Sequence, residues 1–339
     1  MRARTLLIAV LALGLAALAT RQVAVSDAAF SAQKSNPGNT FTASTSFPGI
    51  RVASGFYTGN GADNRNITGV GFQPSAVIVK TSTNQEAVMR TSTMASDATK
   101  QLAGANGLQT NRIQALQSDG FQVGTDAEVN QGGGSPPTYY WVAFKSFPGD
   151  MTLGTYTGNN TSQSITGLGF SPEYVMILGA TTERAVQRMT PMTRTYEFEG
   201  DTGSTTGITS LDANGFSLGN DDEVNNNAVT YHYVAFNEDV DEMKTSSYTG
   251  NGAASQSITG VGFQPNYVIL HGSNTSGTAR EGVHKATAVP NPGSGFFTAT
   301  AGITNGITAL QSDGFQVGNE GNVNNNTTPY SYVAFKDKP

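Results

Sequence analysis

The residues best suited to bind a metal ion lie in a polar loop that occurs three times in the chain. The loop carries Asp126 and Glu128 in its first copy, Asp221 and Glu223 in its second, and Glu320 in its third. Oxygen ligands spaced two residues apart on a turn can wrap around Ca²⁺, although this spacing is not that of an EF-hand. Turns in which Asx side chains bond the backbone account for the same residues. We therefore expect solvated turns, with a calcium site as the alternative and no other cofactor.

A second group of chemically able side chains lies in the middle of each copy, where the copies differ most in length and content. Variable content on a repeated framework is where recognition usually occurs. Drift of loops without function is the alternative. The candidate ligand-binding residues in these segments are Arg184, Arg188, Arg194 and Tyr196 in the second copy, and Arg280 and His284 in the third.

Catalytic constellations find little support in the sequence. Glycoside hydrolysis needs two acids on either side of a cleft, and Asp119 and Asp313 match each other, but Asn214 replaces them in the second copy and all three occupy hairpin turns. There is no P-loop and no dinucleotide fingerprint. A Ser-His-Asp triad would need a histidine that is held between the serine and the aspartate, and nothing in the sequence supports one. The three histidines stand at non-equivalent positions of the copies and are expected to be surface or sheet residues: His232, His271 and His284. We expect no catalytic residue and no enzyme.

Aromatic side chains offer another kind of site, because their ring faces can stack on sugars. Tyr57, Tyr156 and Tyr248 are equivalent and each precedes Thr-Gly-Asn, while Tyr140 and Tyr196 stand elsewhere. A shared role in packing the sheet edge explains the three equivalent tyrosines more simply than a sugar site does.

The framework that must position these side chains is clearest in the strand that closes each copy. It reads TYYWVAFK at Thr138–Lys145, TYHYVAFN at Thr230–Asn237 and PYSYVAFK at Pro329–Lys336. Because side chains on a strand alternate between its two faces, one face carries an aromatic-small row and the other a Val-Phe pair. Only the outermost position of the second face varies in character. This pattern predicts a strand buried over most of its length.

The remaining segments of each copy predict further short strands. An opening strand and Gly-rich turn lead to a Gly-Phe-x-Pro element, an apolar strand and a hairpin with an Asp-Gly or Asn-Gly turn. No segment shows a sustained helical period with caps. The sequence thus predicts an all-β fold of three tandem, homologous, antiparallel β-sandwich domains with a jelly-roll or lectin-like plan. Their predicted ranges are 55–147, 148–241 and 242–339.

Composition excludes several classes of function. The net charge is -6, only 13% of the residues are charged, and the 19 Lys and Arg form no cluster, which argues against nucleic acid as a partner. The chain has no Cys, so disulfides, thiol chemistry and Cys-based zinc sites are absent. A Thr-, Asn- and Gly-rich, weakly charged surface favours lateral association, since self-repulsion is small.

The first 27 residues predict an export signal. Arg2 and Arg4 precede an apolar run from Leu6, and a small-x-small cleavage site ends at Ala19. We therefore expect a secreted protein, extracellular or at the cell surface, with no stable membrane span after the signal is cleaved. An uncleaved anchor is the alternative.

The segment 28–54 predicts an N-terminal tail. Its run AFSAQKSNPGNTFTAST at Ala29–Thr45 resembles the N-terminus of secreted biofilm-matrix fibre proteins, some of which polymerise by lending an N-terminal strand to a neighbour. The resemblance implies a donor strand, with Phe30 and Phe41 as assembly residues. A flexible spacer is the alternative reading.

The order GFxPxxVI, variable middle, IxxLxxxGFx[VL]G, VN and Yx[WY]VAF covers nearly all of 55–336. It resembles a β-sandwich module repeated in bacteriophage tail and tail-fibre proteins and in secreted bacterial surface proteins, similar in plan to small lectin-like sandwiches. The resemblance implies an exported structural or adhesive subunit of a fibre, appendage or tail-fibre-like assembly, whose partners are copies of itself. A lectin-like protein that binds cell-surface glycans is the alternative, and a secreted hydrolase is a remote one.

Overall fold

The structure is a computed structural model that describes residues 49–239, 241–273 and 278–337. The described residues form one compact unit. The predicted signal peptide and most of the predicted tail, including Phe30 and Phe41, lie outside the described residues. Within the described ranges, no helix is both long enough and apolar enough to span a bilayer.

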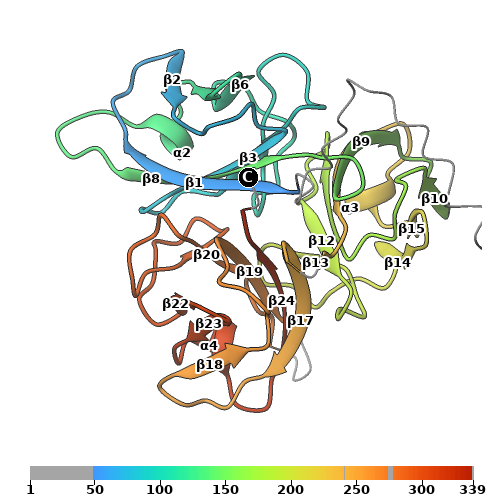
Figure 1. Ribbon diagram of the computed structural model, residues 1–339. Helices are drawn as coiled ribbons and strands as arrows, with labels where there is room; N and C mark the ends of the chain where they lie inside the picture. Colours follow the sequence, from blue (N-terminus) through green and yellow to red (C-terminus); the bar gives the residue numbers. More distant parts are fainter. Residues whose placement is uncertain (1–48, 240, 274–277, 338–339) are drawn as a thin grey trace, which may run out of the picture. The chain divides into compact units, whose positions relative to one another are not determined.

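The described chain contains three successive modules with the same order of elements (Figure 1). The first module contains β1 (Arg51–Thr58), β2 (Arg65–Thr68), β3 (Ala76–Thr81), β4 (Val88–Thr91), β5 (Lys100–Gln101), β6 (Ile113–Gln117), β7 (Gly120–Val123), α2 (Ala127–Asn130) and β8 (Thr138–Lys145). The second contains β9 (Met151–Thr157), β10 (Gln163–Thr166), β11 (Tyr174–Gly179), β12 (Val186–Met189), β13 (Tyr196–Glu197), β14 (Ile208–Asp212), β15 (Gly215–Leu218), α3 (Asp222–Asn225) and β16 (Thr230–Phe236). The third contains β17 (Met243–Thr249), β18 (Gln256–Thr259), β19 (Tyr267–Gly272), β20 (Val283–Ala286), β21 (Gly295–Phe296), β22 (Ile307–Gln311), β23 (Gly314–Val317), α4 (Gly321–Asn324) and β24 (Pro329–Phe335).

Each module is a sandwich of one five-stranded and one three-stranded antiparallel sheet. In the first module the orders are β1-β8-β3-β4-β5 and β2-β7-β6, and the other two modules repeat them. The closing strand lies second in the large sheet, between the opening strand and the long apolar strand. The predicted all-β fold of three tandem antiparallel sandwiches is confirmed.

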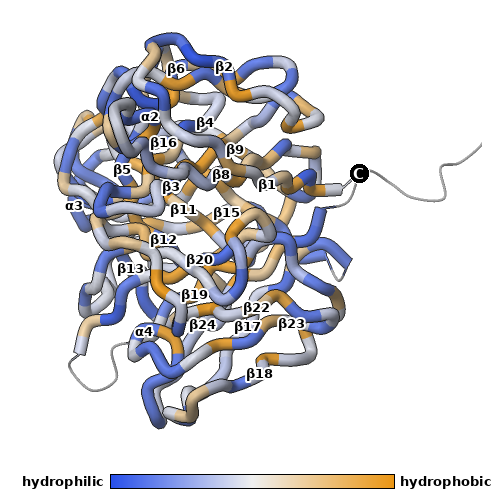
Figure 2. The backbone as a smooth tube through the Cα atoms, turned by 90° about the vertical axis from the view of Figure 1, so that its left-hand side faces the viewer, coloured by the Kyte–Doolittle hydropathy of each residue, from blue (hydrophilic) through white to orange (hydrophobic). Residues whose placement is uncertain are grey.

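The closing strand is buried on both faces, as its alternating sequence predicts. In β8 one face, with Tyr139, Trp141 and Ala143, packs into the core between the two sheets of its own module. The opposite face, with Val142 and Phe144, packs into a different core. The tube in Figure 2 is accordingly hydrophobic along the central strands β8 and β11 and hydrophilic at many of the outer turns.

The second core is shared by all three modules, so they do not behave as separate beads. Phe144, Phe236 and Phe335 hold the same place in the three closing strands, and their rings meet one another. The ring centroids lie 5.5 Å apart for Phe144 and Phe236, 5.3 Å for Phe144 and Phe335, and 5.0 Å for Phe236 and Phe335. Three equivalent residues in mutual contact relate the modules by an approximate threefold axis.

The boundaries between modules run head to tail around this axis. The Ala87 N–H of the first module donates to the carbonyl of Phe297 in the third, at 2.8 Å, and the equivalent Gly282 N–H of the third donates to Phe198 of the second, at 3.0 Å. Between the second and first modules, Arg184 Nε donates to the Ala103 carbonyl at 3.0 Å. Heterologous contacts of this kind close on themselves when the rotation fits.

The first module begins earlier than the sequence predicts. Strand β1 starts at Arg51, four residues before the predicted boundary at Gly55, and Arg51 pairs with Lys145 of the closing strand. The end of this strand is also fixed to the third module, because Arg51 Nε and the Val52 N–H both bond Asp337 at 2.9 Å. The last residues of the predicted tail therefore belong to the sandwich.

Candidate functional site

The predicted calcium loop of the first module forms a single helical turn, α2. The Asp126 side chain caps this helix by accepting the Glu128 N–H at 2.9 Å. The Glu128 carboxylate is buried and bonds Gln101 and Arg112, and Arg112 also lies 3.4 Å from Asp126. These carboxylates thus have protein partners that satisfy them. No helical period is visible in the sequence here, because a single turn is too short to display one.

The second copy of the loop forms α3 in the same way, with Asp221 accepting the Glu223 N–H at 3.1 Å. Glu223 is half-buried and hydrogen-bonded to Glu197, so partial burial and then this neighbouring carboxyl raise the pKa of Glu223 well above its usual range. A carboxyl held neutral is a poor ligand for Ca²⁺. Among the described residues, no group of three or more acidic or histidine side chains is placed to hold a metal ion.

The Val-Asn pair that ends each of these helices has a structural role. In the first module Val129 lies in the module core, and the buried Asn130 accepts the Asn60 N–H at 2.9 Å and donates to the Ala62 carbonyl at 2.7 Å. The asparagine therefore fixes the Gly-rich turn after the opening strand. Tyr57, from the same strand, donates to the Val129 carbonyl at 2.6 Å, which places it in packing as expected.

The candidate ligand-binding arginines of the second module contact protein groups. The Arg188 guanidinium bonds the Ile208 carbonyl of its own module. Arg184 lies 2.6 Å from Glu199 at the boundary with the first module. Arg280 of the third module forms an isolated β-bridge with Asp201 of the second. The structure thus places Arg184 and Arg280 at module boundaries and Arg188 inside the second module, and it does not bring the three together in one place.

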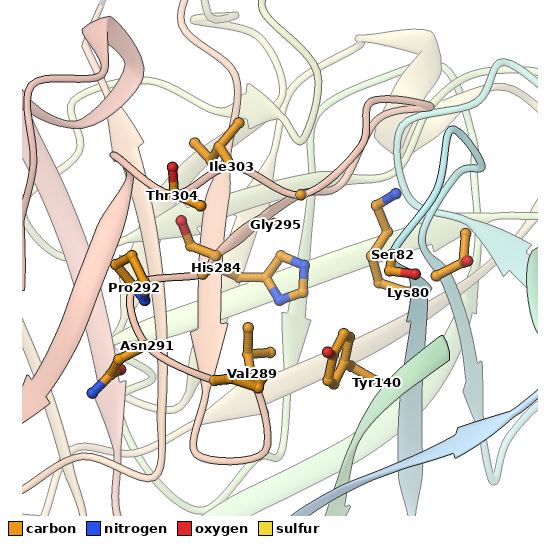
Figure 3. Close-up of a pocket in the computed structure, with 15 residues that line it drawn as sticks. Lys80, Ser82, Tyr140, His284, Val289, Asn291, Pro292, Gly295, Ile303 and Thr304 are labelled. Atoms are coloured by element: carbon orange, nitrogen blue, oxygen red, sulfur yellow. The ribbon is translucent and has the colours of Figure 1, made fainter. Parts of the chain in front are cut away.

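Three pockets nevertheless contain predicted residues. One lies within the second module and contains Arg188, and the other two lie at module boundaries. One boundary pocket, which we call pocket A, encloses about 340 Å³ between the first and third modules. Its lining is mainly apolar. Pocket A is lined by residues that include Lys80, Ser82 and Tyr140 from the first module and His284, Val289, Pro292, Gly295 and Thr304 from the third. Figure 3 shows the His284 ring lying between the loop with Val289 and Pro292 and the side chains of Lys80 and Tyr140.

The His284 imidazole is buried and stacks on Phe297, with 4.4 Å between ring centroids. Its Nδ1 lies 3.3 Å from the Tyr267 hydroxyl. Burial, and then the charge of Lys80, lower the pKa of His284 to about 3. The ring is therefore neutral at physiological pH.

Lys80 is a buried cation whose three protons are already used. Its Nζ donates to the carbonyl oxygens of Thr83 at 3.2 Å, Gln85 at 2.6 Å and Thr300 at 3.0 Å. The last of these bonds crosses to the third module. Burial lowers the pKa of Lys80 to about 8, which is the expected cost of removing an ammonium group from water.

The second pocket, pocket B, encloses about 310 Å³ between the second and third modules. It contains Arg194 and Tyr196 from the second module and His271 and Ser331 from the third. The Tyr196 ring lies over His271, with 4.7 Å between centroids, and Arg194 donates to the Gly203 carbonyl at 3.0 Å.

Pockets A and B occupy equivalent places around the threefold axis. Gly295, Tyr196 and Lys100 hold one sheet position, each opposite the second residue of the preceding strand. Tyr196 fills this position in pocket B. Lys100 fills it at the remaining boundary, where its Nζ donates to the Thr181 carbonyl at 2.9 Å and the Glu183 carbonyl at 2.6 Å. Gly295 has no side chain at this position, so in pocket A the space beside His284 Nε2 is left unfilled.

The variable outermost position of the closing strand lies at the same three boundaries. It is Tyr140 in pocket A and Ser331 in pocket B. At the third boundary it is His232, whose Nδ1 lies 2.8 Å from the Thr93 hydroxyl of the first module. The sequence shows that this position varies within a repeated strand. It does not show that the neighbours of this position belong to another module.

Two features adjoin pocket A. Ser82 also lines a neighbouring polar pocket, which we call pocket C, together with Thr83, Asn84, Gln85, Gln131 and Ser135. The second feature is Phe56, whose ring centroid lies 6.4 Å from that of Tyr140. Among the described residues, Phe56 is the large apolar side chain that stands exposed, at 66%.

The aspartates at the hairpin turns support the backbone. Asp119 accepts the N–H groups of Gly69 at 3.1 Å and Gly71 at 2.7 Å. Asp313 makes the equivalent bonds to Gly260 and Gly262, and these bonds lower the pKa of its carboxyl. Each aspartate lies within its own module, in the hairpin turn of the three-stranded sheet.

Comparison with known proteins agrees with the repeated architecture. No curated protein matches the chain. One family model, described as a domain of unknown function (DUF7483), matches residues 48–146 and again residues 238–338. These segments are the first and third modules, and together they exceed half of the 339 residues. The second module repeats their strand order and closing strand. The chain therefore belongs to the DUF7483 domain family.

Proposed function

We propose that this chain is an exported structural or adhesive protein that acts through non-covalent association and surface binding. The observation that carries the proposal is the core shared by the three modules, centred on Phe144, Phe236 and Phe335. A core of this kind makes one body out of three sandwiches, which suits a subunit that must hold its form while it is attached to neighbours. The loops at the module boundaries are then the surfaces on which a target is contacted.

Self-association through the N-terminal segment belongs to this proposal. A strand that precedes β1 can pair with an open sheet edge of another copy and supply main-chain hydrogen bonds. The large sheet of the first module has two edge strands, β1 and β5. Strand β5 contributes only two residues, Lys100 and Gln101. Export, the cell-surface location and the likeness to fibre and tail-fibre subunits remain parts of the same proposal.

The test compares the chain that starts at Ala28 with a chain that starts at Gly49, by negative-stain microscopy and light scattering. The shorter chain keeps all of β1, whereas a start at Gly55 would remove the residues that pair with Lys145 and bond Asp337. We expect filaments or large oligomers from the longer chain alone. Discrete single particles from both chains would refute assembly through the tail.

A second candidate function, glycan binding, is favoured by pocket A. Its walls join an aromatic ring, apolar side chains and hydroxyl groups at a boundary between two modules. Small-molecule sites are usually concave and mainly apolar, with a few polar groups that fix orientation. A secreted hydrolase would need a pair of acids in such a pocket, and we nominate none.

A further inference from the structure

We propose that pocket A together with pocket C binds a neutral sugar chain, one ring of which enters pocket A beside His284 and Gly295. The proposal rests on the surface-binding role suggested above and names its ligand. Four independent features of this boundary point to it: an unpaired donor, apolar and aromatic walls, the absence of acidic side chains in the lining, and the opening left by one glycine.

The unpaired donor is His284 Nε2. The buried hydroxyl of Tyr267 has Nδ1 of this ring beside it. In the second module the equivalent Tyr174 hydroxyl donates to Gln187 Oε1 at 2.9 Å, so we assign the same direction to Tyr267. A neutral ring that accepts at Nδ1 carries its proton on Nε2. In the described structure Nε2 has no hydrogen-bond partner, which leaves a donor that an oxygen of the ligand can satisfy.

The walls of pocket A suit the less polar face of a sugar ring. Val289, Pro292 and Ile303 supply apolar surface on one side, and the ring of Tyr140 supplies it on the other. The exposed ring of Phe56 lies next to that of Tyr140 and adds aromatic surface outside the lining. The equivalent positions of the other modules hold Thr155 and Ser247 in place of Phe56, so this surface occurs at one boundary only.

The charges of the lining favour a neutral ligand. Among the residues that the structure describes, no Asp or Glu lines pocket A or pocket C, so these linings offer no carboxylate to pair with a cation. The one ammonium group, on Lys80, already donates its protons to three carbonyls, so an anion could bind it only by displacing one of them. Pocket C presents hydroxyl and amide side chains, Thr83, Asn84, Gln85, Gln131 and Ser135, which donate to and accept from sugar hydroxyls.

The opening at Gly295 supplies both the space and the test. A Cβ at Gly295 would lie only 3.1 Å from His284 Nε2, so a side chain there would fill the space beside the unpaired donor. The variant Gly295→Tyr installs the residue that the second module carries at this position, Tyr196. Its matched control is Ser331→Tyr, which enlarges the equivalent residue of Tyr140 in pocket B.

The experiment titrates the full chain with maltotriose, cellotriose, lactose and N,N′-diacetylchitobiose, and with digalacturonic acid as the acidic comparison. Saturation-transfer NMR and calorimetry up to about 10 mM sugar cover the weak affinities expected of a single shallow site. We expect at least one neutral sugar to bind. Gly295→Tyr should weaken that binding by about tenfold or more, and Ser331→Tyr should leave it unchanged.

Several results would overturn the proposal. They are no binding of any neutral sugar, equal binding by wild type and Gly295→Tyr, or tighter binding of digalacturonic acid than of every neutral sugar. If circular dichroism shows that Gly295→Tyr is misfolded, Tyr140→Ser decides instead, since it removes the aromatic wall from the surface and should weaken binding. Filament formation is measured on the same variants, so sugar binding and self-association can fail separately.

Discussion

Replacing Phe236 by alanine should destabilise a module that does not contain this residue. The Phe236 ring is 1% exposed and lies 5.5 Å from Phe144 of the first module and 5.0 Å from Phe335 of the third. Removing a buried phenylalanine costs about 3–5 kcal/mol, and each aromatic pair adds about 0.5–1.5 kcal/mol beyond burial. Two such contacts cross module boundaries, so part of the loss falls on the first and third modules.

The chain provides its own reporter for this effect. Its one tryptophan is Trp141, in the core of the first module. We expect Phe236→Ala to shift the denaturant unfolding curve of Trp141 fluorescence by the same free energy as the curve of the whole chain by circular dichroism, about 3–5 kcal/mol. An unshifted Trp141 transition, with a second transition seen only by circular dichroism, would refute the shared core.

A double-mutant cycle measures the contact itself. Phe236→Ala combined with Phe335→Ala should depart from additivity by about 0.5–1.5 kcal/mol, because the two rings touch. The control replaces Phe216, which is 0% exposed in the separate core of the second module, together with Phe335. That pair should be additive to within about 0.5 kcal/mol.

Three further outcomes follow from the structure. Glu223→Gln should be more stable than wild type by a margin that grows as pH rises above 4.5. The reason is that burial and Glu197 raise the pKa of Glu223, so the folded wild type must hold its proton. A difference in denaturation midpoint between variant and wild type that is the same at pH 5 and at pH 8 would contradict this. Burial lowers the pKa values of His271 and His284 to about 4 and about 3. Their contribution to stability should therefore be present above pH 6.5 and be lost as pH falls toward 4. Replacing both by Gln should flatten the free energy of unfolding against pH over this range, and an unchanged slope would count against the prediction. The first module alone, residues 49–147, exposes the face that carries the shared core and should form trimers or aggregates in size-exclusion chromatography with light scattering; a stable monomer would argue against the need for a partner.

Much of the module was predictable because strands report burial through alternation. The two apolar faces of the closing strand correctly indicated that both are covered. The pattern could not say that the Val142 and Phe144 face is covered by other modules, since apolar periodicity is the same whether the cover is a sheet of the same sandwich or a neighbour.

The boundary site was less accessible from sequence. Variation in the middle of each copy drew attention to Tyr196 and His284, and Tyr140 was considered as an aromatic side chain whose ring could stack on sugars. Pocket A has Gly295 where the other two boundaries have Tyr196 and Lys100, and a lone glycine in a variable segment has no distinctive pattern. Its meaning appears only when the strand pairing places it opposite His284 and aligns it with Tyr196.

The arrangement of three linked modules also changes what a substitution can do. In an assembly of three identical subunits, every exchange is copied into all three contacts, so a residue that opens one contact weakens the others equally. In a single polypeptide each contact is encoded once. Gly295, Tyr196 and Lys100 can therefore differ, and each boundary can carry its own side chain without the same exchange being made at the other two.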